Sequence, residues 1–187
     1  MGWIQTYTGK RFDPLAPDPS SIDIEDIAHA LSNICRFTGH VAEFFSVAQH
    51  SVIVSMVVPE EDAMHGLLHD ASEAYICDIA KPIKSLPGWE PYRAIEHRLQ
   101  RAIYDRFGLG EEPASIKQAD YRMLVTEACE LMSPMHPDWF AVIEQKARYD
   151  GMSLRGYCWS PTDAKATFLR CFHALSHKGS QVTGDGH

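Results

Sequence analysis

Four side chains of the types that bind divalent cations fall on three separate predicted helices: His50, the adjacent pair His69 and Asp70, and Asp120. Imidazole and carboxylate groups suit an ion such as Mn, Co, Fe, Ni, Zn or Mg, with open positions left for water and substrate. Neighbouring residues of a helix diverge by roughly 100°. His69 and Asp70 therefore reach one ion only if it lies between their directions, and other helices must complete the site.

A third ionisable side chain follows the His-Asp pair in the segment GLLHDASEAY. Glu73 lies four residues after His69 and three after Asp70, which places it on the same face of a helix. A His-Asp dipeptide alone is weak evidence, because it occurs by chance in many proteins. Three ionisable groups on one face behind an apolar segment are costly unless they bind an ion or one another. The cluster therefore favours a metal site with a carboxylate beside it.

Hydrophobic spacing predicts the helices that must position these residues. Apolar residues recur at helical intervals in six segments, which are about 22–35, 45–58, 59–75, 91–107, 113–132 and 160–175. Residues 1–13 alternate around a Thr-Gly step and predict a short hairpin. Residues 13–21 and 77–91 carry three prolines each and predict connecting loops. Residues 133–159 read as irregular, with a short helix near 138–148.

These patterns predict an all-α fold of about six helices with a short N-terminal β-hairpin, and no internal repeat. The chain has 187 residues, which suits one domain with a full hydrophobic core. We expect that domain to span residues 1–177. The polar, glycine-containing segment 178–187 predicts a disordered tail.

Composition narrows the partners and the compartment. The chain carries 17 Lys and Arg against 25 Asp and Glu, a formal charge of −8, which is the wrong sign for binding a phosphate backbone of DNA or RNA. No apolar stretch approaches the length of a membrane span, and the N-terminus does not resemble a secretory signal. Five cysteines without a C-x-x-C pair fit reduced thiols. We expect a cytoplasmic protein that binds neither nucleic acid nor membrane.

Four segments together resemble the H…HD…D signature of the HD-domain metal-dependent phosphohydrolases: SVAQHS (46–51), LLHDASEAY (67–75), DIAKPIK (78–84) and KQAD (117–120). The match is closest to the small YfbR-like 5′-deoxynucleotidases and to similarly sized phage and bacterial deoxynucleoside triphosphate phosphohydrolases. It covers about residues 22–132 and is specific because the motifs occur in the correct order. It implies an HD-domain helical bundle, a homodimer or higher homo-oligomer, and the cytoplasm, or the host cytoplasm for a phage protein.

The resemblance also implies a role for individual residues. The ligands of a single divalent cation would be His50, His69, Asp70 and Asp120, and the catalytic carboxylates would be Glu73 and the ligand Asp70. The substrate would contact Arg36 and Lys84 at its phosphate, Phe37 near its base or sugar, and Asp78 at its deoxyribose. The loop between Arg36 and His50 is about one residue shorter than in the deoxynucleotidases, so base preference does not transfer. The region after Met132 does not match.

The expected reaction is removal of phosphate from the 5′ position of deoxynucleotides. A deoxynucleoside triphosphate triphosphohydrolase of the dATP type is the alternative, because the motifs are common to both groups. An HD-fold di-iron oxygenase would need two further ligands, for which only His97 offers itself. A non-catalytic nucleotide-binding regulator would be expected to have lost a ligand or Glu73, and none is lost.

Other ring-bearing residues have simpler interpretations. We expect His65 to pack behind the site, His97 to lie on a solvated helix face, and Trp89 to anchor its loop onto the core. For His40, contact with a phosphate and plain exposure to solvent are equally consistent with the sequence.

Overall fold

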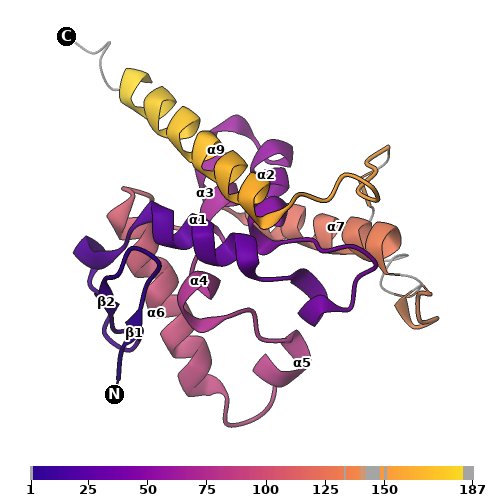
Figure 1. Cartoon of the computed structure of the whole chain (residues 1–187), viewed down its shortest axis with the longest axis horizontal. Coiled ribbons are helices and arrows are strands. Elements are labelled where there is room, and N and C mark those ends of the chain that lie inside the picture. The colour runs from indigo at the N-terminus through magenta and orange to yellow at the C-terminus, as the bar shows by residue number, and fades with distance from the viewer. Residues whose placement is uncertain (1, 133, 140, 142–147, 150, 183–187) are drawn as a thin grey trace.

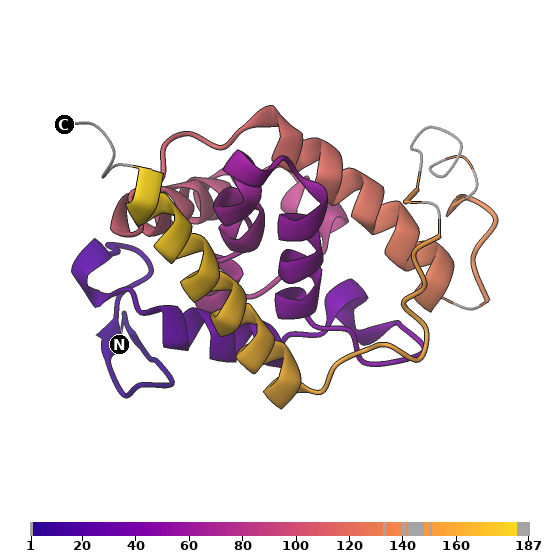
Figure 2. The ribbon, with the colours of Figure 1, turned by 90° about the horizontal axis from the view of Figure 1, so that it is seen from above.

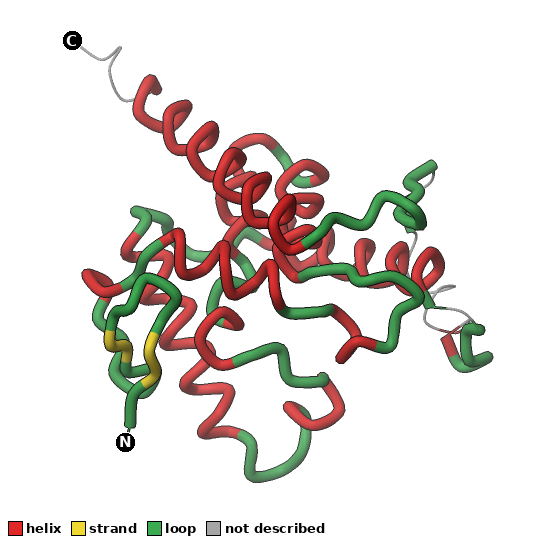
Figure 3. The backbone as a smooth tube through the Cα atoms, viewed as in Figure 1, coloured by secondary structure: helices red, strands yellow, loops and turns green. Residues whose placement is uncertain are grey.

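Helices make up most of the computed structural model, which describes residues 2–132, 134–139, 141, 148–149 and 151–182. Within that part of the chain, strands occur only in an N-terminal hairpin (Figure 3). The predicted all-α fold with a short hairpin is thus confirmed. No helix among these residues is both long and apolar enough to cross a bilayer.

The hairpin pairs β1 (Ile4–Gln5) with β2 (Arg11–Phe12) in antiparallel register. It is fixed to α1 (Ile24–Asn33) by the buried carboxylate of Asp26, which accepts hydrogen bonds from the amide of Thr8 at 2.7 Å and from its hydroxyl at 3.0 Å. The hairpin therefore belongs to the body of the fold.

Two helices at the centre position the first two candidate ligands, with His50 inside the first helix and His69 directly after the second. They are α2 (Val47–Val57) and α3 (Ala63–Leu68). A Cβ atom on Gly66 of α3 would lie 2.9 Å from the Cα atom of Ser55 in α2, closer than real Cβ contacts allow. A glycine is needed there because the two helix backbones approach too closely for any side chain.

The remaining helices surround this pair. They are α4 (Glu73–Ile76), α5 (Lys81–Lys84), α6 (Glu90–Arg106), α7 (Ala114–Leu131) and α9 (Pro161–Val182). Helix α9 packs across α1, α2 and α3, and α7 packs against α2 (Figure 1). Seen from above, α9 and α7 lie on opposite sides of the central helices (Figure 2).

Two hydrophobic clusters hold these layers together. The larger joins the hairpin, the central helices, α6 and α9, with fully buried Phe12, Leu67 and Phe168 among its members. The smaller lies between α2 and α7, around Val54 and Met123. The two clusters fix both ends of α2, and with it the position of His50.

The predicted continuous helix over 59–75 is wrong. Helix α3 ends at Leu68, residues 69–72 form turns, and α4 begins at Glu73. Across this break the backbone bonds span three residues, from the amide of Ala71 to the carbonyl of Leu68 and from the amide of Glu73 to the carbonyl of Asp70. The amide group of Gln100 in α6 bonds to the backbone on both sides of the break.

Other boundaries also differ from the prediction. The expected loop over 77–91 contains α5, whose Pro82 lies in the first turn, where a missing amide costs nothing. Helix α9 continues to Val182, so the expected tail is helical at Lys178, which pairs with Glu60 at 2.6 Å. Residues 183–187, and most of the short helix expected near 138–148, lie outside the described residues.

Candidate metal centre

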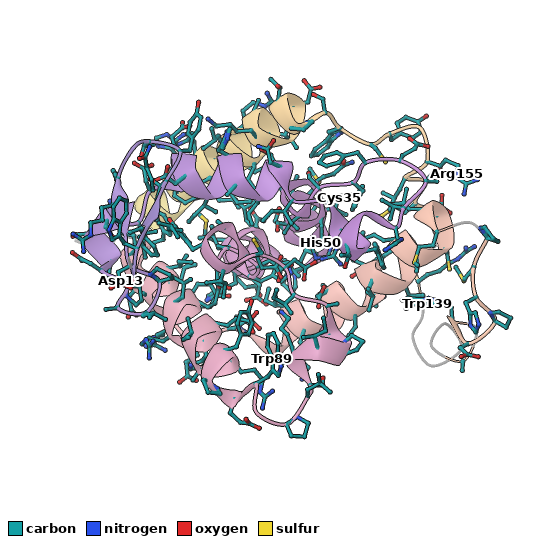
Figure 4. All side chains as sticks on the ribbon, turned by 60° about the horizontal axis from the view of Figure 1, so that its bottom comes forward. Asp13, Cys35, His50, Trp89, Trp139 and Arg155 are labelled. Carbon is teal, nitrogen blue, oxygen red and sulfur yellow. The ribbon has the colours of Figure 1, made fainter. Side chains whose placement is uncertain are left out.

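The imidazole groups of His50 and His69 meet the carboxylate of Asp120 at one point. One ligand atom from each of these residues lies within 4.8 Å of those of the other two. The His50 Nε2 atom is 3.2 Å from His69 Nε2 and 3.3 Å from Asp120 Oδ1. These residues come from α2, from the turn after α3 and from α7, and Figure 4 shows His50 near the centre of the molecule.

Both imidazoles have their other nitrogen bound to a protein acceptor. His50 Nδ1 donates to Glu127 Oε1 at 2.5 Å, and His69 Nδ1 donates to the Gly66 carbonyl at 2.9 Å. An imidazole held in this way by its Nδ1 proton presents the Nε2 lone pair as its ligand atom. Both Nε2 atoms face the shared point, so the donor set fits a divalent cation.

Asp70 adds a second carboxylate to the group. Its Oδ2 atom lies 3.2 Å from His69 Nε2 and 3.7 Å from His50 Nε2. The same oxygen is 3.6 Å from Arg36 Nη1. All four predicted ligands therefore converge, with Asp120 the most exposed, at 35% of its side-chain surface.

Arg36 reaches this group because the chain between Cys35 and Ser46 closes on itself. These two residues form an isolated antiparallel bridge, and the Arg36 amide donates to the Phe45 carbonyl at 2.9 Å. Ser46 then caps α2 through its hydroxyl, one turn before His50. The bridge brings Arg36 beside the start of the helix that carries His50.

Glu127 is a member of the site that the sequence analysis missed. Its side chain is fully buried, and its two oxygens hold two different residues, His50 Nδ1 and Arg36 Nε, the latter at 3.0 Å. The available signal was its position in α7, seven residues after Asp120 and therefore two turns along the same face. A buried carboxylate at that spacing was not weighed.

The charges of the site shift its protonation equilibria strongly. Burial alone would lower the pKa of His69, but the carboxylates of Asp70 and Asp120 together with the Gly66 carbonyl raise it to about 9. Burial would raise the pKa of Asp70, but His69, His50 and Arg36 hold it well below its usual range. In the metal-free protein near neutral pH, the carboxyl group of Asp70 is therefore ionised. The ring of His69 carries protons on both nitrogens and is positively charged.

Glu73 lies at the edge of this group, on α4. It is 6% exposed, and its Oε2 atom has no hydrogen-bond partner among the described residues. Burial, reinforced by the negative charges of Asp70 and Asp78, raises its pKa well above the ordinary value. Glu73 lines a pocket of about 260 Å³ together with His69, Asp70 and Lys84. A buried carboxyl group with a free oxygen beside the ligand cluster is placed to exchange a proton with a bound molecule.

The other predicted substrate residues are less completely assembled. Lys84 is already paired with Glu96 at 2.8 Å. Asp78 is half-buried and acts on Glu73 and Lys84 through its charge. Phe37 has a φ of 54° and lies beside the Arg36 guanidinium, 5.7 Å from ring centre to Cζ. Its ring meets that of Trp139 edge to face at 6.4 Å, and Figure 4 places Trp139 toward one edge of the molecule.

The remaining rings fall outside the ligand group. His65 packs edge-on against Tyr104, in agreement with a structural role. His97 is exposed and lines the same pocket as Glu73, while His40 is exposed to solvent. Trp89 contacts Tyr92 edge to face rather than any of the four predicted ligands.

Comparison with known proteins identifies relatives. Over 132 residues the chain is 43% identical to the uncharacterized protein YfdR of Escherichia coli (strain K12), covering 70% of this chain and 73% of YfdR. Over 127 residues it is 37% identical to an uncharacterized protein of Rhodobacter capsulatus, of which it spans 64%. No family model matches the sequence.

Proposed function

We propose that this chain, which belongs to the same protein family as YfdR of Escherichia coli, acts as a metal-dependent phosphohydrolase of the HD-domain type, with 5′-deoxynucleotides as its substrates. The four ligands of its single divalent cation are His50, His69, Asp70 and Asp120. The proposal joins two independent supports, which are the order of the sequence motifs and the geometry of the residues within them.

One observation carries the proposal. Two Nε2 atoms and a carboxylate oxygen from three separate elements lie within 4.8 Å of one another, and both imidazoles donate their Nδ1 proton to the protein. A buried histidine that only fills space does not require its free nitrogen to face a second histidine and an acid. Burying these charged groups costs desolvation free energy. A bound cation offsets that cost, because it interacts favourably with both imidazoles and the carboxylate.

The residues around the cluster suit the transfer of a phosphoryl group to water. A bound divalent cation would polarise a phosphate oxygen and lower the pKa of a water molecule. The buried carboxyl group of Glu73 takes or relays the proton that such a reaction releases. Arg36 lies beside the start of α2, with its Nη1 atom 3.6 Å from Asp70 Oδ2, and would offer its guanidinium to the phosphate oxygens. Lys84, in its pair with Glu96, lines the pocket that contains Glu73, and a bound phosphate would compete with Glu96 for its ammonium group.

A product assay tests the proposal. Purified protein with Mn, Co or Mg is incubated with each deoxynucleoside monophosphate and triphosphate, and nucleoside, phosphate and triphosphate are separated by chromatography. Release of nucleoside and phosphate from monophosphates supports the 5′-deoxynucleotidase. Release of triphosphate with monophosphates inert replaces it with the triphosphohydrolase. No turnover with any metal contradicts both reactions and leaves the oxygenase and the regulator to be tested by metal content per chain.

A further inference from the structure

The chain breaks its helical path at the His-Asp pair, and one side chain from a distant helix bonds to both ends of the break. In a continuous α-helix the amide of Ser72 would donate to the carbonyl of Leu68. Instead, the Ser72 amide donates to Gln100 Oε1 at 3.0 Å, and Gln100 Nε2 donates to the Leu68 carbonyl at 2.7 Å. The carboxamide therefore stands in the place of one backbone hydrogen bond.

The two contacts of Gln100, with Leu68 and Ser72, enclose residues 69–71, which include both His69 and Asp70. Side chains that enter the backbone hydrogen-bond ladder are a known cause of helix breaks. The backbone of His69 and of Ser72 keeps helical dihedral angles, so the contacts of Gln100 replace a backbone hydrogen bond and fix where this segment lies. In the structure Asp70 Oδ2 lies 3.2 Å from His69 Nε2, and both atoms approach His50.

Gln100 is itself held firmly. It lies on α6 between Leu99 and the Ala102–Ile103 pair, of which Leu99 and Ile103 are fully buried in the larger hydrophobic cluster. The position of this stretch of α6 is therefore set by the core, and the carboxamide of Gln100 connects it to the turn at 69–72.

We propose that Gln100 is a positioning residue, which holds the turn at 69–72 in the place where His69 and Asp70 face the same cation. The inference rests on the metal centre proposed above, but it is independent of which phosphate ester the protein hydrolyses. The carboxamide of Gln100 bonds to backbone groups on both sides of the ligand pair, and its side chain also lines the pocket that contains Glu73. The test therefore measures metal affinity and ligand geometry rather than hydrolysis.

The test replaces Gln100 by Met, which preserves the length of the side chain but can neither donate nor accept these bonds. Mn²⁺ affinity is measured by calorimetry, the visible spectrum of the Co²⁺-loaded protein reports ligand geometry, and thermal unfolding of the metal-free protein reports stability. We expect Q100M to lose tenfold or more in Mn²⁺ affinity, because outer partners of metal ligands are commonly worth about 10–100-fold. Its Co²⁺ spectrum should differ from that of the wild type.

Gln49 provides a matched control. Its side chain also joins two backbone groups, accepting from the Trp159 amide at 2.8 Å and donating to the Tyr157 carbonyl at 3.0 Å, but it connects α2 to the segment before α9. We expect Q49M to lower the melting temperature as much as Q100M does, with Mn²⁺ affinity within about twofold of the wild type. Equal losses of affinity in the two variants would mean that general destabilisation is the cause, and would overturn the proposal.

A second variant covers the case in which Q100M does not fold. Gln100→Asn retains the carboxamide but is one methylene shorter, so it cannot reach both Leu68 and Ser72, and we expect at least a fivefold loss of affinity. Wild-type affinity in Q100N, or in Q100M, refutes the positioning role alone. A wild-type protein that binds neither Mn²⁺ nor Co²⁺ overturns the metal centre and this inference together, whereas metal binding without phosphatase activity contradicts only the proposed reaction.

Discussion

Replacing Glu127 by Gln should destabilise the metal-free protein more than any exposed substitution would. The carboxylate is 0% exposed and joins His50 Nδ1 at 2.5 Å to Arg36 Nε at 3.0 Å. An amide at this position presents one oxygen and one NH₂ group to two donors, so one of them loses its acceptor. Among the described residues, the ion pair that the buried guanidinium of Arg36 keeps is the one with Asp70, at 3.6 Å, and the charges of Asp120 and Glu73 act on it from farther away.

The size of the effect follows from the burial of the pair. Removing one partner of a buried ion pair costs about 3–5 kcal/mol, because the other charge stays buried without compensation. For a chain of this length about 1 kcal/mol corresponds to roughly 2–4 °C, so the melting temperature should fall by about 6–20 °C. The exposed pair of Glu60 and Lys178, with side chains 77% and 66% exposed, supplies the control. Because exposed ion pairs contribute little to stability, Glu60→Gln should leave the melting temperature almost unchanged.

The assay is urea denaturation of a double-mutant cycle, with the protein stripped of metal. Arg36→Met combined with Glu127→Gln removes both charges, so its loss of unfolding free energy should be smaller than the sum of the two single losses. The measured coupling is expected in the range of about 1–3 kcal/mol. A loss below about 1 kcal/mol in E127Q, or strict additivity in the double variant, would refute the argument that Glu127 balances a buried charge.

Three further predictions address the helix crossing, the protons and the free carboxyl group. Gly66→Ala should lower the free energy of unfolding by about 1–3 kcal/mol, because the new Cβ atom would lie 2.9 Å from Ser55 Cα. Gly110→Ala is the control and should leave stability unchanged, because nothing lies within 4 Å of its Cβ position. Equal stability of the two variants in urea denaturation would contradict the close approach of α2 and α3. Metal-free His69 keeps its second ring proton up to its pKa of about 9, and a metal ion must displace that proton. Mn²⁺ affinity should therefore rise about tenfold per pH unit between pH 7 and 9 for each proton displaced. Calorimetry in buffers of different ionisation enthalpy measures the proton release, and its absence would contradict this prediction. Burial, together with neighbouring negative charge, raises the pKa of Glu73 above its unfolded value, so this group destabilises the fold increasingly as pH rises above about 4.5. Glu73→Gln should therefore gain stability relative to the wild type at pH 8 compared with pH 5, and should lose about 10²–10⁴-fold in hydrolysis with Mn²⁺ affinity unchanged.

The sequence was sufficient to predict the features that depend on local spacing. Helical periodicity located α1, α2, α6 and α7 to within a few residues. The ligand types of His50, His69, Asp70 and Asp120 indicated a cluster, and the structure brings all four together. Helical periodicity and short ligand motifs both depend on residues that are close in the sequence, so they can be recognised without a structure.

The features that the sequence did not reveal depend on residues far apart in the chain. The break at 69–72 depends on Gln100, 28 residues after Ser72, so periodicity alone favoured an unbroken helix. The pairing of Lys84 with Glu96 crosses from α5 to α6. Glu127 was missed because a single acidic residue in an amphipathic helix usually faces solvent, and only its contacts with Arg36 and His50 distinguish it.

The bond of one carboxylate to both His50 and Arg36 constrains how the family can diverge. A mutation of Arg36 or Glu127 alone leaves the other residue as an unpaired buried charge. A mutation of His50 removes the second hydrogen-bond donor to the Glu127 carboxylate. Among relatives these three positions should therefore change together or stay as they are. A homologue that keeps the histidine but has exchanged both Arg36 and Glu127 for apolar residues would have found a different way to orient its imidazole, and with it a different environment for whatever the site binds.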